Sequence, residues 1–350
     1  MLSRKNITLA AVAGIAAGLF IEHRKDANLH SGDAFERGRF ASQPHQMTWL
    51  GWRDVFWRSV SEASEDRLLS FAASVAFYAL LAIVPALSVL ISIYGLIGDP
   101  SGVVSQIQPF TSILPNSARD LIIEQATRLA AQPHASLSLN LVVSILLAGW
   151  SANAAIKSLF DALNVIYDER EKRSFLWLNL VSLSVTFSAV IVLMLALLAI
   201  AAVPVALTFL PYNHQLAWVL TLARWPAFYV VAVLGIAALY WIGPSRRAPK
   251  FSWVLPGATM AAAAWAITSA AFSYYVSSLG NYSASYGSLA TVVVSMTWLW
   301  LSAAVVLLGA QINSELEHQT LQDTTMGEPK PLGARGAVMA DRVGAAVAQD

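Results

Sequence analysis

Four polar side chains recur at helical spacing within one long apolar stretch of this sequence. They are Asn153, Lys157, Asp161 and Asn164, separated by four, four and three residues. Residues three or four positions apart share one face of a helix, so the lysine and the aspartate can pair there. Ionisable groups inside a membrane-spanning helix are costly and usually face a bundle interior or a wet cavity. The four residues are therefore candidates for lining a polar pathway that opens to the cytoplasm.

The same spacing also fits a purely structural role. Lys157 and Asp161 lie near the predicted inner end of their helix, where a lysine extends its ammonium group to water and an aspartate is hydrated. This position favours the structural interpretation over the pathway. Arg224, in another apolar stretch, lies within about two turns of the predicted outer boundary, so the same two interpretations apply to it. If Arg224 is buried, it needs a partner or an anionic substrate.

A third polar feature is an uncharged, hydroxyl-rich connection at residues 281–288. It contains Asn281, Tyr282 and Tyr286 among serines and one glycine. These side chains can donate hydrogen bonds to a polar headgroup at an outer opening. They fit equally well a solvated turn whose tyrosines lie at the membrane interface.

The elements that position these residues are long apolar segments. Of the 350 residues, 57% are hydrophobic and only 12% are charged, whereas about a quarter of the residues in a soluble domain are charged. A helix needs roughly 20 apolar residues to cross the hydrocarbon core with every backbone amide satisfied. The sequence therefore predicts an all-α, polytopic membrane bundle of six transmembrane helices within residues 51–317. Their approximate ranges are 71–97, 137–163, 175–210, 216–242, 251–278 and 287–313.

Lysine and arginine residues cluster on alternate connections between these spans. The segments before the first span and after the second and fourth spans are basic, whereas the third and fifth connections contain neither residue type. Positive residues accumulate on the cytoplasmic side of membrane proteins. We therefore expect both ends of the six-helix core to lie in the cytoplasm. The residues behind this expectation are Arg53, Arg58, Arg67, Arg170, Lys172, Arg173, Arg246, Arg247 and Lys250.

The remaining segments predict four further features. Residues 1–50 read as a short hydrophobic anchor, at residues 7–21, followed by a polar linker; if the anchor crosses the membrane, there are seven spans. An amphipathic helix precedes the first span and lies on the cytoplasmic membrane surface or against the bundle. The outer loop 98–136 is long enough to hold a helix. The tail 318–350 turns polar and reads as disordered and cytoplasmic.

The sequence contains no motif that is typical of an enzyme. It has no cysteine, and its six histidines are scattered without paired ligand spacing. No HExxH, glycine-rich phosphate loop or GxSxG nucleophile elbow occurs. The net charge of +1 gives no overall field that attracts nucleic acid. We therefore expect no enzymatic activity, no metal or cofactor and no nucleic-acid partner. The expected partners are the lipid bilayer and a small-molecule or lipid-linked substrate.

Several sequence motifs are shared with one membrane-protein family. The first span contains AASVAFYALLAIVP at residues 72–85, the fifth contains PGA at 256–258, and the last ends in LGAQIN at 308–313. In order and spacing, from Trp52 to Glu317, the sequence resembles the YihY/BrkB family of bacterial inner-membrane proteins, whose earlier name is ribonuclease BN. The resemblance implies a six-helix bundle in the inner (plasma) membrane with cytoplasmic termini, and a link to bacterial virulence.

One position departs from the pattern of this family. Many relatives have glutamate where this chain has Gln311. A neutral amide cannot carry a proton or balance a cation, so the resemblance does not carry over any mechanism that needs an acid there. Gln311 remains a candidate pathway residue.

Transport is the activity usually suggested for this family. Six spans, polar residues at two span ends and proline-interrupted helices lead us to expect a transporter or exporter of a polar or amphiphilic, envelope-related substrate. The alternative is a scaffold without transport activity that recruits envelope partners through its outer loop and tails. A ribonuclease, the third reading, finds no supporting residues, because neither a cluster of metal ligands nor a basic groove is visible.

Overall fold

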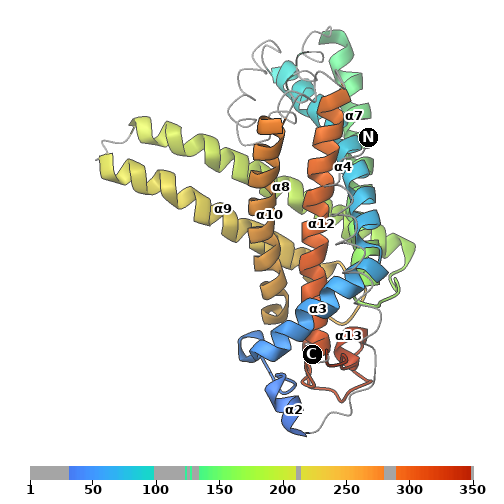
Figure 1. Ribbon diagram of the computed structural model, residues 1–350. Coiled ribbons are helices and arrows are strands. Elements are labelled where there is room, and N and C mark those ends of the chain that lie inside the picture. The colour runs from blue at the N-terminus through green and yellow to red at the C-terminus, as the bar shows by residue number, and fades with distance from the viewer. Residues whose placement is uncertain are drawn as a thin grey trace, which may run out of the picture.

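Four long helices lie side by side in the computed structural model (Figure 1). The structure describes residues 31–97, 123, 127, 134–209, 214–279 and 289–347. Within this part there is no β-strand, and one isolated bridge joins Pro249 to Thr325. The four helices, here called the main bundle, are α4 (Leu68–Ile97), α7 (His134–Ile166), α10 (Phe251–Leu279) and α12 (Leu289–Gln319).

Two further long helices, α8 (Phe175–Phe209) and α9 (His214–Ile242), lean away from the main bundle as a pair (Figure 1). α8 packs against α7, and α9 packs against α10. Their outward faces carry large apolar side chains, among them Phe187 and Trp225, which are more than half exposed. Apolar surface of this extent needs a cover of lipid tails or another protein. The pair therefore suits the interior of a membrane.

The all-helical, polytopic architecture that the sequence predicts is confirmed. Five helices of the described part, α7, α8, α9, α10 and α12, contain segments long and apolar enough to cross a membrane. The number rises to six if α3 (Trp49–Glu65) and Leu68–Ile83 of α4 are counted as one broken span. The chain bends by 65° between these two helices. Arg67 lies at the bend with a positive φ of 54°, which turns the chain out of α3 and into α4.

Helix α3 is the amphipathic helix expected before the first span. It begins after Thr48, whose hydroxyl oxygen accepts a hydrogen bond from the backbone N–H of Gly51. Side chains at such N-cap positions satisfy backbone donors that have no partner inside the helix. One face of α3 packs against α12, whereas the opposite face exposes apolar side chains, including Trp49 and Phe56. One face of α3 therefore lies against the bundle, as one sequence interpretation expects. The other face is available to the membrane surface, as the other interpretation expects.

The segments before α3 and after α12 pack together at one end of the main bundle (Figure 1). At this end, here called the charged end, α7 and α12 finish and α10 begins. The layer contains α2 (Ser31–Glu36), the short 3-10 helix η1 (Pro44–Gln46) and α13 (Val338–Asp341). Thr320 links its two parts, because its hydroxyl donates to the carbonyl of Ala41 at 2.7 Å.

This packing differs from the polar linker and the disordered tail expected from the sequence. Residues 320–347 contain little regular secondary structure, yet many of them are buried. A buried arginine explains how such a segment keeps one conformation, because a single guanidinium satisfies several backbone carbonyls. Arg335 donates, at 2.5 to 3.3 Å, to the carbonyl oxygens of Leu321, Gln322, Lys330 and Ala340. The proposed anchor at 7–21 and nearly all of the outer loop 98–136 lie outside the described residues.

Candidate functional site

A buried ion pair joins the connection between α9 and α10 to the end of α12. The two Nη atoms of Arg246 donate to the two carboxylate oxygens of Glu317 at 2.7 and 2.8 Å, and the side chains are 1% and 0% exposed. The guanidinium carbon lies 3.9 Å from the centre of the Tyr167 ring, a cation–π contact. Burial alone would lower the pKa of Arg246, but the Glu317 carboxylate raises it above its ordinary value. The Glu317 carboxylate therefore favours the charged form of the buried guanidinium.

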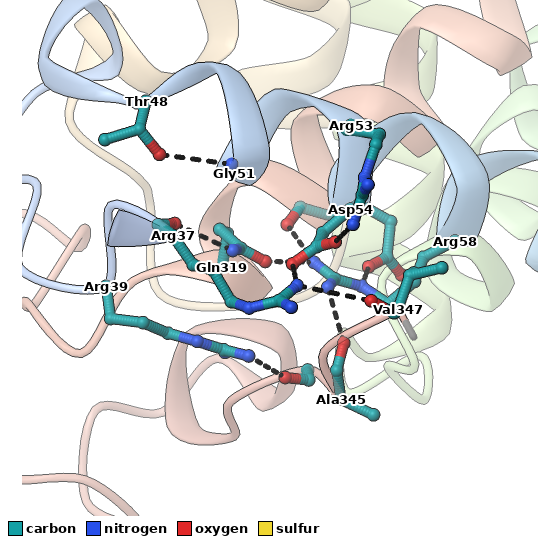
Figure 2. Close-up of polar contacts among 12 residues, drawn as sticks. Arg37, Arg39, Thr48, Gly51, Arg53, Asp54, Arg58, Gln319, Ala345 and Val347 are labelled. Carbon is teal, nitrogen blue, oxygen red and sulfur yellow. Dashed lines mark hydrogen bonds and ion pairs between the residues drawn. The ribbon is translucent and has the colours of Figure 1, made fainter. Parts of the chain in front are cut away.

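A second buried ion pair attaches α3 to the same turns of α12. Arg58 Nε lies 2.5 Å from a carboxylate oxygen of Glu315. Arg58 Nη2 also donates to the side-chain oxygen of Gln319 at 2.7 Å (Figure 2). His318 Nδ1 lies 3.5 Å from the same oxygen of Glu315. The last two turns of α12 thus hold separate segments of the chain through charge-assisted hydrogen bonds, which are the stronger class.

The connection between α7 and α8 is fastened to the end of α9. Arg173 donates to the carbonyl oxygens of Ile242 and Gly243 at 3.2 and 2.7 Å. These carbonyls belong to the helix terminus, where a basic side chain is favourable. Arg173 also pairs with Glu171 at 2.7 Å. Burial raises the pKa of the Glu171 carboxyl, but the hydrogen bonds from Arg173 outweigh it and lower the pKa to about 2.

The polar stripe predicted on α7 divides into residues with different surroundings. Lys157 Nζ donates to the side-chain oxygen of Asn179 in α8 at 2.5 Å, and no ion pair joins it to Asp161, which is exposed. Asn164 lies at the charged end, where its side-chain oxygen accepts from the backbone N–H of Ser245 at 2.7 Å. Of the two interpretations, the exposed Asp161 agrees with a hydrated aspartate, and Lys157 contacts a neighbouring helix instead of pairing with it.

Two other candidates are buried amides inside the candidate spans. Asn153 in α7 is 8% exposed and Gln311 in α12 is 1% exposed. The side-chain oxygen of each is buried and has no hydrogen-bond partner among the residues that the structure describes. The side chain of Arg224, and the residues Asn281, Tyr282 and Tyr286, lie outside the described part of the structure. Whether these residues line a pathway stays a prediction.

Carboxylates gather at the bend between α3 and α4. Burial first, and then the negative charges of Glu62, Asp168 and Glu315, raise the pKa of Asp66 to about 7. Within residues 31–97, 134–209, 214–279 and 289–347, no group of three histidine, aspartate or glutamate side chains is placed to hold a metal ion. The Asp66 carboxyl at the bend between α3 and α4 thus titrates near neutral pH.

We expect Asp66 to make stability depend on pH. Its pKa is raised in the folded protein, so its stabilising contribution is complete below the ordinary carboxyl pKa of about 4 and is lost as the pH rises through about 7. Asp66→Asn should then raise the melting temperature relative to wild type at pH 8, by on the order of a few degrees, and by less at pH 5. Thermal unfolding of both proteins in detergent from pH 4 to pH 8 measures this. An Asp66→Asn advantage that is the same at both ends of this range contradicts the expectation.

Most of the described chain, from within α3 to the first part of the segment after α12, falls within a region shared with other proteins. One family model, described as virulence factor BrkB, matches residues 59–332 of this chain. The chain belongs to the BrkB family. The match extends beyond α12 into the segment that contains Asp323 and Lys330, so the first part of the folded tail, up to residue 332, belongs to the family region. The family resemblance expected from the sequence motifs is confirmed.

Relatives of this BrkB-family chain come from several bacteria. The protein YfkH of Bacillus subtilis (strain 168), which has a ribonuclease-like name, is 30% identical over 262 residues, covering 71% of this chain and 90% of that protein. A UPF0761 membrane protein of Tolumonas auensis is 29% identical over 289 residues, covering 78% of this chain and 87% of that protein. No solved structure matches this chain. Together with the apolar helices, these relatives identify a membrane protein.

Sequence reasoning missed the buried pairs at the charged end. In the sequence, Arg246 and Arg58 contribute only to the predicted orientation, Glu317 only marks the end of the predicted membrane domain, and Glu315 has no assigned role. The sequence does contain a signal for these ion pairs, because two carboxylates come directly after an apolar stretch. Such carboxylates need cationic partners once the following segment folds over them. The partners themselves come from distant positions, so the spacing alone does not identify them.

Proposed function

We propose that this BrkB-family membrane protein is a transporter or exporter of a polar or amphiphilic substrate of the cell envelope. The observation that carries the proposal is the pair of buried amides, Asn153 and Gln311, whose side-chain oxygens have no partner in the described part of the structure. A buried polar atom without a partner costs about 1–3 kcal/mol. In membrane helices, polar groups that bear such a cost usually mark a substrate or ion pathway.

A lysine in α7, the helix that contains Asn153, also supports the transport proposal. Lys157 lies inside the candidate span Val142–Ile166, and its hydrogen-bond partner Asn179 is a neutral amide. Among the described residues Lys157 forms no ion pair, and the Asp161 carboxylate, one turn further along α7, acts on it only through space. An ammonium group that is hydrogen-bonded but not neutralised attracts an anionic group. The hydrogen bond from Lys157 to Asn179 joins α7 to α8, and α8 leads away from the main bundle (Figure 1).

We also infer that the charged end faces the cytoplasm and that the bundle lies in the bacterial inner membrane. The basic residues of two connections, among them Arg173 and Arg246, gather at this end. The positive-inside rule supports this orientation. No enzymatic activity is part of the proposal, since the sequence has no catalytic motif and the ribonuclease-like name belongs to a relative.

The test is a flux measurement with the purified protein in liposomes. We expect wild type to move at least one member of a panel of anionic and amphiphilic envelope precursors. Lys157→Gln should reduce the flux about tenfold or more, because it removes the uncompensated charge, and a tenfold change corresponds to about 1.4 kcal/mol. Lys172→Gln is the matched control: its ammonium group is largely exposed and pairs with Glu169 outside the spans.

Two results contradict the transport proposal. The first is a folded wild-type protein that moves no member of the panel. The second is a flux that falls equally in Lys157→Gln and Lys172→Gln, because the loss would then follow from total charge and not from the span.

A membrane scaffold without transport activity is the second candidate, and the folded tails favour it. Residues 34–48 and 320–347 form one ordered layer at the charged end. Two large aromatic side chains, Phe35 in this layer and Trp49 at the start of α3, are more than 70% exposed. Surfaces of this kind bind partners or membranes. If flux is absent, crosslinked partners that disappear when these aromatic residues are replaced support the scaffold.

A further inference from the structure

Arg39 is a fully buried arginine without a carboxylate partner. It lies in the turn that follows α2, and its exposed fraction is 0%. Its Nη2 atom donates to the carbonyl of Gly344 at 2.6 Å (Figure 2). Its Nε and Nη1 atoms have no hydrogen-bond partner in the described part of the structure. A buried guanidinium is costly unless its donors are satisfied and its charge is balanced.

The carboxylate whose charge acts on Arg39, Asp54, is already paired with Arg37, and the Glu315 carboxylate is paired with Arg58. Asp54 lies 2.6 Å from Arg37, and Glu315 lies 2.5 Å from Arg58. Both carboxylates are at most 1% exposed, so water does not compensate for an imperfect balance. Burial first, and then the positive charge of Arg58, lower the pKa of Arg39 to about 10. Within the described residues, the charge of Arg39 is therefore left without an opposite charge of its own.

The last described residues of the chain cover these arginines. Residues 344–347, here called the strap, accept hydrogen bonds from Arg39, Arg58 and Arg37 at 2.6, 2.9 and 3.3 Å, respectively (Figure 2). All three acceptors are backbone carbonyl oxygens, which satisfy a donor but do not neutralise a charge. Two guanidinium groups from the turn after α2 and one from α3 thus converge on a row of weak acceptors. Planar guanidinium forks in such an arrangement match an anion that has several oxygens.

We propose that Arg37, Arg39 and Arg58 form a binding site for a phosphate group and that the strap covers this site until phosphate displaces it. Phosphate oxygens can accept the hydrogen bonds that the strap carbonyls now accept, and their charge would balance Arg39. The phosphate group can belong to a soluble molecule or to a lipid headgroup. The free apolar face of α3, which supplies Arg58, brings the site close to headgroups. The site is separate from the proposed transport pathway.

The absence of cysteine from the chain makes the strap easy to follow. Ala345→Cys places a single spin label on the strap, at an exposed position. In the full-length protein in detergent, we expect inorganic phosphate to increase the mobility of this label, and chloride at the same ionic strength to leave it unchanged. A second arm uses phosphatidylcholine nanodiscs with and without phosphatidylglycerol. A response to phosphatidylglycerol alone assigns the site to a lipid phosphate, and a response to inorganic phosphate assigns it to a soluble one.

Variants at the two sides of the contact test the site by calorimetric titration with phosphate. Arg39→Gln should weaken binding by about tenfold or more, because it removes charge-assisted hydrogen bonds. Arg342→Gln, at an exposed arginine that pairs with Asp168 on the surface, should leave the affinity unchanged. Gly344→Val should strengthen binding about tenfold, because a Cβ atom there would lie 2.8 Å from the Arg58 guanidinium and push the strap away.

A spin label that responds neither to inorganic phosphate nor to phosphatidylglycerol, in a folded protein, overturns the proposal. Equal weakening by Arg39→Gln and Arg342→Gln overturns it as well, since the effect would then reflect net charge. If Arg39→Gln does not fold, the wild-type label response and the Gly344→Val affinity decide the question.

Discussion

The substitution Gly257→Val is expected to force α10 and α12 apart and to cost at least about 3 kcal/mol of stability. A Cβ atom on Gly257 would lie 2.1 Å from the carbonyl oxygen of Gly309 and 2.6 Å from the side chain of Asn313. Neither neighbour can yield easily. The first is backbone, and Asn313 accepts from the Gly257 N–H at 2.7 Å while donating to the Val254 carbonyl at 2.8 Å. Separating the helices breaks both hydrogen bonds.

Thermal unfolding of the purified protein in detergent measures this cost. The chain offers two matched controls, because Gly149 and Gly235 also lie in candidate spans and a Cβ atom on either would meet no atom within 4 Å. Gly149→Val and Gly235→Val are expected to change stability by less than about 1 kcal/mol. If Gly257→Val unfolds at the same temperature as these controls, the close approach of α10 and α12 is not what holds the bundle together.

Replacing Glu317 by alanine is expected to cost about 3–5 kcal/mol, because it leaves Arg246 buried without a counter-charge. Arg246 is 1% exposed on its side chain, so water cannot take over the role of the carboxylate. Its Nε atom already lacks a partner, and the substitution would leave the two Nη atoms without theirs as well. The contact of Arg246 with the Tyr167 ring remains, but it supplies no negative charge.

A double-mutant cycle separates the interaction energy of the Arg246–Glu317 pair from the contributions of the two single side chains. Arg246→Met combined with Glu317→Leu should be less destabilising than Glu317→Ala alone, because no isolated charge remains buried. The control is Asp168→Asn, in an exposed pair with Arg342 whose side chains are 63% and 66% exposed. It should change stability by less than about 0.5 kcal/mol. Additive effects at Arg246 and Glu317 would show that the two side chains do not stabilise each other.

The membrane helices could be predicted because the signal for them is local. The predicted spans 175–210 and 251–278 correspond to α8 (Phe175–Phe209) and α10 (Phe251–Leu279) almost to the residue. An apolar stretch long enough to cross the bilayer must form a helix whatever its neighbours are, since its backbone amides have no other partners there. Hydropathy therefore locates helices without any knowledge of packing.

The candidate site was less predictable, because its contacts join residues far apart in the sequence. Helical spacing correctly placed Lys157 and Asp161 on one helix, but α8 lies close enough to offer Asn179 as the partner. Asn164 was read as part of the same stripe. Its side chain lies at the end of α7 and forms hydrogen bonds with Ser245 and Glu171. It therefore joins the connection between α7 and α8 to the connection between α9 and α10.

The two tails also show that the sequence does not reveal contacts between distant residues. Composition predicts disorder when a segment is polar and rich in glycine and proline, since such a segment buries little apolar surface. The segment 320–347 stays ordered by another means, because Arg335 ties its carbonyls together and Glu169 accepts a hydrogen bond from the Val338 N–H at 2.8 Å. Composition does not register hydrogen bonds from one buried arginine.

By itself, the sequence determined that this chain is a helical membrane protein of the BrkB family, because hydropathy and family motifs are properties of short segments. Only the tertiary structure decided which charges meet. Arg246 and Glu317 are 71 positions apart, and Arg39 and Gly344 are 305 apart. Such pairs form because an unsatisfied charge buried at the charged end is costly. The partners that satisfy it can come from any part of the sequence that the fold places there.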